Sequence, residues 1–211
     1  MKILSLGRIE YSAALEIQNR LVEELTAGTG EETLLLLEHE PVYTIGRTRD
    51  QSSLRETAHL PYPVIETNRG GQATYHGPGQ LVGYPILDLN RCGRDLHLYL
   101  RFLEDFLIEL CDAHGIESAR REGLTGVWVG ARKIASLGVG VRKWITMHGF
   151  ALNVLESSMQ PFLNITPCGI AGVQMTNIER ETGQALDFQT FSRQAGELFV
   201  HQYSNSFSSC P

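Results

Sequence analysis

The sequence predicts an α+β fold in which mixed, mostly antiparallel sheets are packed against helices. Strand-like segments follow one another in runs and do not alternate one for one with helices, as they would in a regular βαβ fold. Only three segments carry apolar residues at three- and four-residue intervals, the period of a helix with one buried face. With 211 residues, 42% of them hydrophobic, the chain can bury one sizeable core.

Each helical segment has a recognisable start or stop. The first follows Ser12, a candidate N-cap, and stops at Gly28. The second and longest follows Asp95, which predicts a capping carboxylate, and stops before Gly115. The third follows Thr190 near the end of the chain. A polar stretch comes after it, so we predict one domain over residues 1–205 and a mobile tail over residues 206–211.

Strands are predicted where short apolar or β-branched runs lie between turn residues. These runs are residues 3–6, 33–38, 42–45, 64–66, 73–75, 81–87, 126–129, 133–141 and 146–153. The brief connections at 130–132 and 142–144 predict hairpins between consecutive strands. Neither an internal repeat nor a change of composition marks a second domain.

Composition narrows the class of protein. A net charge of −6 disfavours a general nucleic-acid binder, which needs a basic face to neutralise phosphates. No apolar run is long enough for a membrane span, and no secretory leader is recognisable. The four cysteines form no CxxC pair, so we expect free thiols in a reducing, cytoplasmic compartment. We also expect a monomeric protein. Cys111 and His114 are spaced like metal ligands, but no second close pair completes a zinc site, so we predict no metal.

A glycine-rich stretch at residues 68–80 has two interpretations. Its glycines would let the backbone approach a ligand closely, or they would serve the bends of a tight hairpin. The stretch matches neither a dinucleotide fingerprint nor a phosphate loop, because the spacing of its glycines differs from both.

Lys133 and Cys168 are the candidate reactive residues. Lys133 shares a strand face with apolar residues, so it either extends its amine out to solvent or is kept for amine chemistry. Cys168, in T-P-C-G-I, is either an apolar residue buried in a turn or a thiol presented at a sharp bend. At such a bend we expect neighbouring backbone N–H groups to be open to an oxyanion. A lysine ammonium beside the thiol would raise its thiolate fraction, so the two form a coherent pair if the fold brings them together.

Four motifs in order carry a family resemblance. They are R-G-G-Q-A-T-Y-H-G-P-G-Q-L-V-G-Y-P-I-L-D-L from Arg69, G-V-W-V-G-A-R-K-I-A-S-L-G from Gly126, H-G-F-A-L-N-V from His148 and P-C-G-I from Pro167. With E-H-E-P-V-Y-T-I-G-R from Glu38, they resemble lipoyl(octanoyl) transferases over residues 34–178. The resemblance implies the catalytic-domain fold shared with biotin and lipoate protein ligases.

The resemblance also implies a reaction and a site. The family moves an octanoyl group from acyl carrier protein to a lysine of lipoyl domains, in the E2 subunits of 2-oxoacid dehydrogenases, or of glycine-cleavage H protein. Cys168 would be the nucleophile and Lys133 the acid and base, with no cofactor and no metal. The substrate-binding residues implied are Arg69, Gly70, Gly71, Gln72, Ala73, Thr74, Tyr75, His76, Ser136, Leu137, Gly138, Gly149, Phe150 and Ala151.

Two alternatives stay open. An ATP-dependent lipoate or biotin protein ligase has a related loop and lysine, but it does not need the cysteine. A non-catalytic module that binds acyl carriers would use the same fold. Acyl carrier proteins are acidic, so this chain would need a local positive surface to bind one. The alternative is a surface on which both charges are evenly mixed. The candidates for that surface are Arg47, Arg49, Arg69, Arg132 and Arg142.

Overall fold

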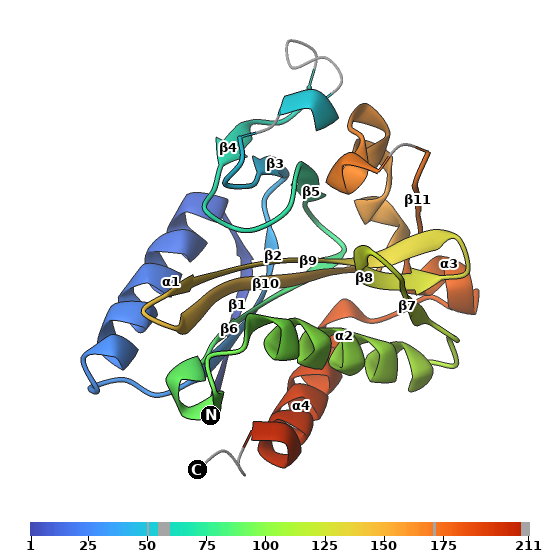
Figure 1. Ribbon diagram of the computed structural model, residues 1–211. Coiled ribbons are helices and arrows are strands. Elements are labelled where there is room, and N and C mark those ends of the chain that lie inside the picture. The colour runs from blue at the N-terminus through green and yellow to red at the C-terminus, as the bar shows by residue number, and fades with distance from the viewer. Residues whose placement is uncertain (50, 55–59, 171, 208–211) are drawn as a thin grey trace.

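A large mixed sheet runs through the middle of the molecule (Figure 1). The computed structural model describes all residues except 50, 55–59, 171 and 208–211. Within that part of the chain the sheet has the order β1-β2-β6-β10-β9-β8-β7, and β11 pairs with β9. The strands are β1 Lys2–Ile9, β2 Thr33–His39, β6 Gln80–Ile86, β7 Ala119–Arg121, β8 Leu124–Val129, β9 Arg132–Arg142, β10 Ile145–Asn153 and β11 Gln174–Met175.

Most neighbours in this sheet are antiparallel; the β1/β2 and β11/β9 pairs are parallel. A smaller sheet with the order β4-β3-β5 lies above it in Figure 1. Its strands are β3 Val42–Ile45, β4 Val64–Glu66 and β5 Thr74–His76. The predicted α+β class with mixed, mostly antiparallel sheets is confirmed.

Helices cover both faces of the large sheet. Helix α1 (Tyr11–Thr26) packs on one face, while α2 (Leu96–Asp112) and α4 (Phe188–Phe207) pack on the other (Figure 1). Strand β2 shows why, because Leu35 and Leu37 pack with the α1 side and Leu34 and Leu36 with the α2 and α4 side. Each leucine buried in this way contributes about 1.5–3 kcal/mol, so a strand apolar on both faces is stable only between two helical layers.

The helix ends test the predicted caps. Asp95 caps α2 as predicted, since its carboxylate accepts bonds from the N–H groups of His97 and Leu98. Ser12 is not a cap, because α1 begins at Tyr11 after Glu10. Thr190 lies inside α4, and the carboxylate of Asp187 accepts its N–H at 2.8 Å instead.

Helix α4 also changes the predicted tail. It includes residues 206 and 207, and the Phe207 ring is buried 4.8 Å from the Phe102 ring, centroid to centroid. The prediction of a tail from residue 206 is therefore wrong for those two residues, and residues 208–211 lie outside the described part of the chain. In that described part no helix is long and apolar enough to cross a membrane.

The remaining helical segments are short. Helix α3 (Ile178–Thr182) was not predicted. The 3₁₀ turns are η1 Gln51–Ser53, η3 Leu89–Cys92, η4 Glu156–Ser158, η5 Gln160–Asn164 and η6 Pro167–Gly169. The last of these carries the candidate nucleophile and lies beside β5 of the small sheet.

Candidate active site

Cys168 occupies a strained turn between the two sheets. Its φ is 56°, a left-handed value that few residues other than glycine adopt, and Gly169 follows at 67°. A β-carbon at Gly169 would lie 1.3 Å from Oε1 of Gln72, so only glycine fits there. The Cys168 N–H donates to the Ala73 carbonyl at 2.9 Å. The turn is thus tied to the glycine-rich segment and presents the thiol at a fixed place.

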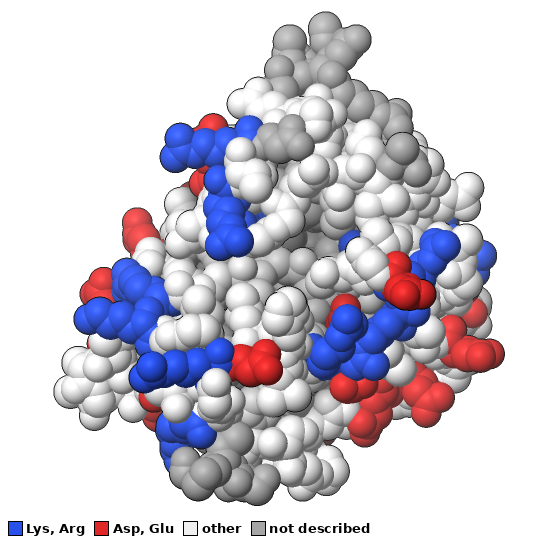
Figure 2. All heavy atoms as spheres, in the orientation of Figure 1, with Lys and Arg blue, Asp and Glu red and all other residues white. Residues whose placement is uncertain are grey.

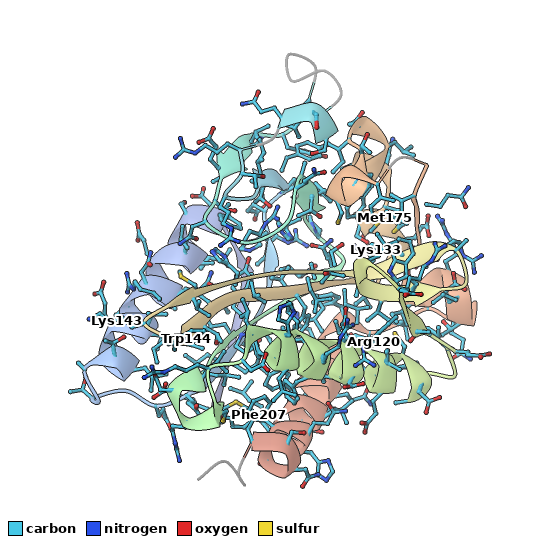
Figure 3. All side chains as sticks on the ribbon, in the orientation of Figure 1. Arg120, Lys133, Lys143, Trp144, Met175 and Phe207 are labelled. Carbon is cyan, nitrogen blue, oxygen red and sulfur yellow. The ribbon has the colours of Figure 1, made fainter. Side chains whose placement is uncertain are left out.

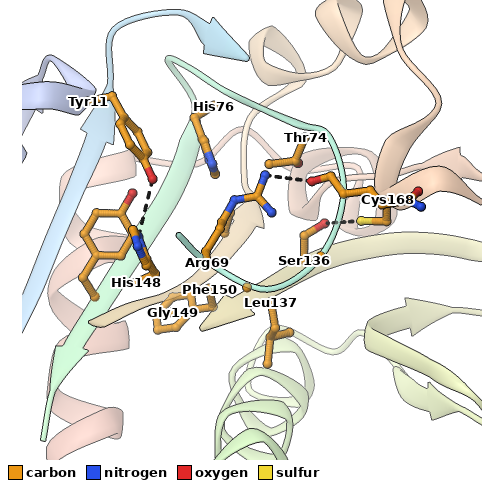
Figure 4. Close-up of a pocket in the computed structure, with 15 residues that line it drawn as sticks. Tyr11, Arg69, Thr74, His76, Ser136, Leu137, His148, Gly149, Phe150 and Cys168 are labelled. Atoms are coloured by element: carbon orange, nitrogen blue, oxygen red, sulfur yellow. Dashed lines mark hydrogen bonds between the residues drawn. The ribbon is translucent and has the colours of Figure 1, made fainter. Parts of the chain in front are cut away.

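Lys133 lies against this thiol. Its Nζ donates to Sγ of Cys168 at 3.2 Å and to the Thr125 carbonyl at 2.9 Å. The residue is only 1% exposed, so its amine does not extend to solvent. Ser136 adds a hydroxyl 3.8 Å from the same sulfur (Figure 4). The structure therefore brings together two residues that are 35 positions apart in sequence.

The chain leaves room for the buried amine. Gly126 has a φ of 128°, and a β-carbon there would lie 2.5 Å from Cε of Lys133. The Trp128 ring lies beneath the amine, with its centroid 5.4 Å from Nζ. The ring face attracts the ammonium and excludes water from it.

The expected oxyanion donors are not open. The N–H groups of Cys168, Gly169 and Ile170 donate to the carbonyls of Ala73, Thr166 and Pro167. The prediction of free N–H groups at this bend is therefore wrong, because two of them close the turn and that of Cys168 ties the turn to Ala73.

A small pocket of about 40 Å³, partly open to solvent, adjoins the thiol (Figure 4). Most of the predicted substrate-binding residues line it, and they come from β5, β9, β10 and the segment before β5. Those that line it are Arg69, Gly71, Gln72, Thr74, His76, Ser136, Leu137, Gly138, Gly149, Phe150 and Ala151.

Three predicted residues do not line the pocket. The Gly70 N–H donates to the Val139 carbonyl, which ties the glycine-rich loop to β9. Ala73 is fully buried and accepts the Cys168 N–H, and Tyr75 packs in an aromatic cluster with Tyr43 and Phe162. These three residues support the pocket wall without facing the pocket.

Three lining residues were not predicted, namely Tyr11, Tyr84 and His148. Tyr84 and His148 lie within the quoted motifs, so the motifs carried the signal. Tyr11 opens helix α1, and nothing in its local sequence marks it.

Several polar side chains of the pocket wall are hydrogen-bonded to each other or to residues behind the wall. His148 donates from Nε2 to Asn68 at 2.6 Å, so its Nδ1 accepts from the Tyr11 hydroxyl at 3.4 Å (Figure 4). His39 lies 2.7 Å from the Tyr84 hydroxyl. The surface that faces the pocket is mainly carbon. Such a surface suits an aliphatic chain.

The histidines of this wall are neutral. Burial lowers the pKa of His39 and of His148 to about 4. Burial, followed by the nearby His39, holds the pKa of His76 well below the usual 6.5, and its Nδ1 donates to Oε1 of Gln80 at 2.8 Å. At neutral pH these histidines therefore add no charge to the pocket.

Arg69 is the cation of the pocket. Its guanidinium, in a residue 6% exposed, donates to the side chain and carbonyl of Thr44 and to the carbonyls of Gly70 and Gln72. Burial lowers the pKa of Arg69, and attraction to Tyr11 and Cys168 partly opposes this. The guanidinium stays charged at neutral pH and adds a fixed positive potential near the thiol.

The expected basic patch is not continuous. Arg69 is buried, and three of the other candidates pair with acids: Arg49 with Glu66 at 3.2 Å, Arg132 with Glu181 at 2.9 Å and Arg142 with Glu23 at 3.3 Å. Figure 2 shows basic and acidic side chains interspersed around an uncoloured centre on this face. Within the described residues, no group of three or more His, Cys, Asp or Glu could hold a metal ion.

Residues 10–200 match the family model described as "Lipoyl protein ligase A/B catalytic domain". An octanoyltransferase from Geobacter sulfurreducens is 53% identical over 186 residues, which cover 88% of this chain and 77% of that protein. The chain belongs to the octanoyltransferase family. A second octanoyltransferase, from Citrifermentans bemidjiense, is 55% identical over 180 residues, or 85% of this chain and 86% of that one. The predicted family is confirmed, and the protein is an octanoyltransferase.

Solved structures confirm the predicted fold. A putative lipoate protein ligase from Thermoplasma acidophilum superposes with a TM-score of 0.69 at 14% identity, over 97% of this chain and 84% of that one. A biotin protein ligase from Aquifex aeolicus, in complex with biotin and ATP, superposes with a TM-score of 0.59 at 14% identity, over 99% of this chain and 72% of that one. Octanoyltransferases therefore share the ligase catalytic fold, and the identity is too low to transfer the ligases' chemistry.

Proposed function

We propose that this octanoyltransferase takes octanoyl from the thioester of acyl carrier protein and passes it to a lysine of lipoyl domains or of glycine-cleavage H protein. Transfer runs through a thioester on Cys168, with Lys133 as the acid and base. The observation that carries the proposal is the 3.2 Å contact between Nζ and Sγ beside a pocket faced with carbon. The reaction is cytoplasmic and needs no cofactor.

In the first half-reaction the Cys168 thiolate attacks the carbonyl carbon of the carrier thioester. The bond between that carbon and the carrier sulfur breaks, and the Lys133 ammonium protonates the departing thiolate. The Arg69 guanidinium stabilises the oxyanion through its charge, since the N–H groups of Cys168, Gly169 and Ile170 are occupied. The products are octanoyl-Cys168, a carrier thiol and a neutral Lys133.

In the second half-reaction the acceptor amine attacks octanoyl-Cys168. A lysine of reference pKa about 10.4 is neutral about 0.04% of the time at pH 7, so it first loses one proton to water. Neutral Lys133 takes the second proton as the amide forms, and the Cys168 thiolate leaves. This restores the starting ion pair, so one lysine serves both halves of the cycle.

The direct test is the intact mass of the enzyme after mixing with octanoyl carrier protein. We expect one added octanoyl group that neutral hydroxylamine removes and that the variant Cys168→Ser does not acquire. Lys133→Ala should stay folded and transfer at a strongly reduced rate. Donor binding with no added mass in the wild-type enzyme would reduce the protein to a binding module.

A second experiment separates transfer from ligation. One mixture holds octanoyl carrier protein without ATP, and the other holds free octanoate with ATP and magnesium, each with a lipoyl domain as acceptor. We expect octanoylated acceptor only from the first mixture. Product from the second mixture alone would make the protein a ligase and remove the need for Cys168.

A further inference from the structure

A buried carboxylate lies behind the proposed acid and base. Glu104, on helix α2, has a side chain only 1% exposed. One of its oxygens, Oε2, accepts from Arg101 at 2.6 Å and from Arg120 at 2.9 Å. Both arginines are partly exposed, so a surface acid could pair with them without the cost of burial. The ion pairs alone do not account for the position of this carboxylate.

The other oxygen of Glu104 reaches the strand that holds Lys133. Its Oε1 accepts from the N–H of Gly126 at 3.0 Å. That N–H and the Thr125 carbonyl belong to one trans peptide, so they point in opposite directions. The carbonyl accepts from Lys133 Nζ at 2.9 Å. Glu104 and Lys133 thus bind the two ends of the same peptide group, and in Figure 3 the side chain of Arg120, a residue of β7, lies on the α2 side of the large sheet, below Lys133.

This peptide needs an anchor because regular sheet pairing does not supply one. The β8/β9 register shifts between Val127 and Trp128, and the φ of 128° at Gly126 is outside normal strand geometry. A negative charge on the N–H side also polarises the peptide and strengthens its carbonyl as an acceptor for an ammonium.

We propose that Glu104 is a positioning residue for octanoyl transfer. Through the peptide between Thr125 and Gly126 it fixes the carbonyl that holds Lys133 against Cys168, and its charge strengthens that carbonyl as an acceptor for the lysine amine. This inference rests on the proposed function, since it assigns a role relative to those two reactive residues.

The test is the variant Glu104→Gln, which keeps the shape of the side chain and removes its charge. We expect kcat for octanoyl transfer to fall about ten- to a hundredfold, the effect typical of groups that orient a functional residue from behind, with KM for the carrier little changed. The pH profile of Cys168 alkylation by iodoacetamide should move to higher pH. The control is Glu32→Gln, because Glu32 also accepts a backbone N–H, that of Asp88 at 2.9 Å, and lies outside the pocket lining. It should leave kcat and the alkylation profile unchanged.

Each outcome decides a separate claim. If Glu104→Gln folds and its kcat and alkylation profile are unchanged, the inference about Glu104 is overturned. The proposed function still stands in that case, provided that Cys168→Ser loses transfer. Transfer retained in Cys168→Ser would instead remove the proposed function. If Glu104→Gln does not fold, amide exchange in the wild-type enzyme still decides. We expect the Gly126 N–H to exchange slowly, and exchange as fast as that of an exposed loop would overturn the inference.

Discussion

Lowering the pH from 7 to 5 should destabilise this protein through its buried histidines. His39 and His148 have folded-state pKa values of about 4 because burial disfavours their charged forms, against about 6.5 in the unfolded chain. Between those two values the unfolded state binds more protons than the folded state. Stability is therefore full above about pH 6.5 and falls as the pH drops toward 4.

The size of the effect follows from these values. Each histidine costs about 0.2 kcal/mol at pH 7 and about 2 kcal/mol at pH 5. Together His39 and His148 should lower the free energy of unfolding by about 4 kcal/mol over this range. His76, whose pKa is also lowered by burial, adds to the loss in the same direction. Such a loss is a large fraction of the stability of a typical domain.

Urea denaturation followed by circular dichroism at pH 7, 6 and 5 measures this loss. The variant His39→Gln should lose about half of the pH dependence contributed by the pair, because the amide can still bond the Ile9 carbonyl and the Tyr84 hydroxyl without titrating. His201→Gln is the control, since His201 is exposed on α4. A wild-type loss below about 1 kcal/mol, or an unchanged slope in His39→Gln, would refute the reasoning.

Substitutions at glycines and in the last helix give three more predictions. Gly126→Ala should lower transfer by about a hundredfold or more, because its β-carbon would lie 2.5 Å from the active-site lysine, while Gly130→Ala, with open space around it, should keep normal activity. Gly169→Ala should abolish formation of the octanoyl enzyme, whereas Gly183→Ala, at the same φ of 67° with nothing nearby, should not; mass spectrometry checks both. Phe207→Ala should lower the free energy of unfolding by about 3 kcal/mol in urea, and a loss under about 1 kcal/mol would mean that this ring is not part of the core.

The fold was more predictable than the site. Local patterns decide long elements, so the apolar run of β2 and the cap at Asp95 were correctly predicted. Strand β11 and helix α3, at Ile178–Thr182, are too short to show a period and depend on neighbours for their stability. Ser12 failed as a cap because burial of Tyr11, which local sequence does not reveal, sets where α1 begins.

In the site, residue types were easier to predict than their surroundings. Cys168 and Lys133 were singled out from sequence, but only the packing of the turn at Pro167–Gly169 beside β9 decides their 3.2 Å contact. The backbone donors expected around the thiol bond within the turn or to Ala73, and the second of these contacts depends on tertiary packing. Tyr11 reaches the pocket from a helix far away in sequence, so no motif could have identified it.

The two proposed reactive residues have sequence neighbours in different hydrophobic clusters. Lys133 lies on β9, whose Ile134 and Ala135 are part of the large core, whereas Cys168 follows Ile165 of a smaller core that includes Tyr43 and Tyr75. The contact between amine and thiol therefore spans a seam between two packed units. Loosening the smaller unit, for example by Ile165→Val, should change the alkylation rate of the thiol while the unfolding of the large core stays the same. We therefore expect the reactivity of the Cys168 thiol to report how the smaller core packs against the large one.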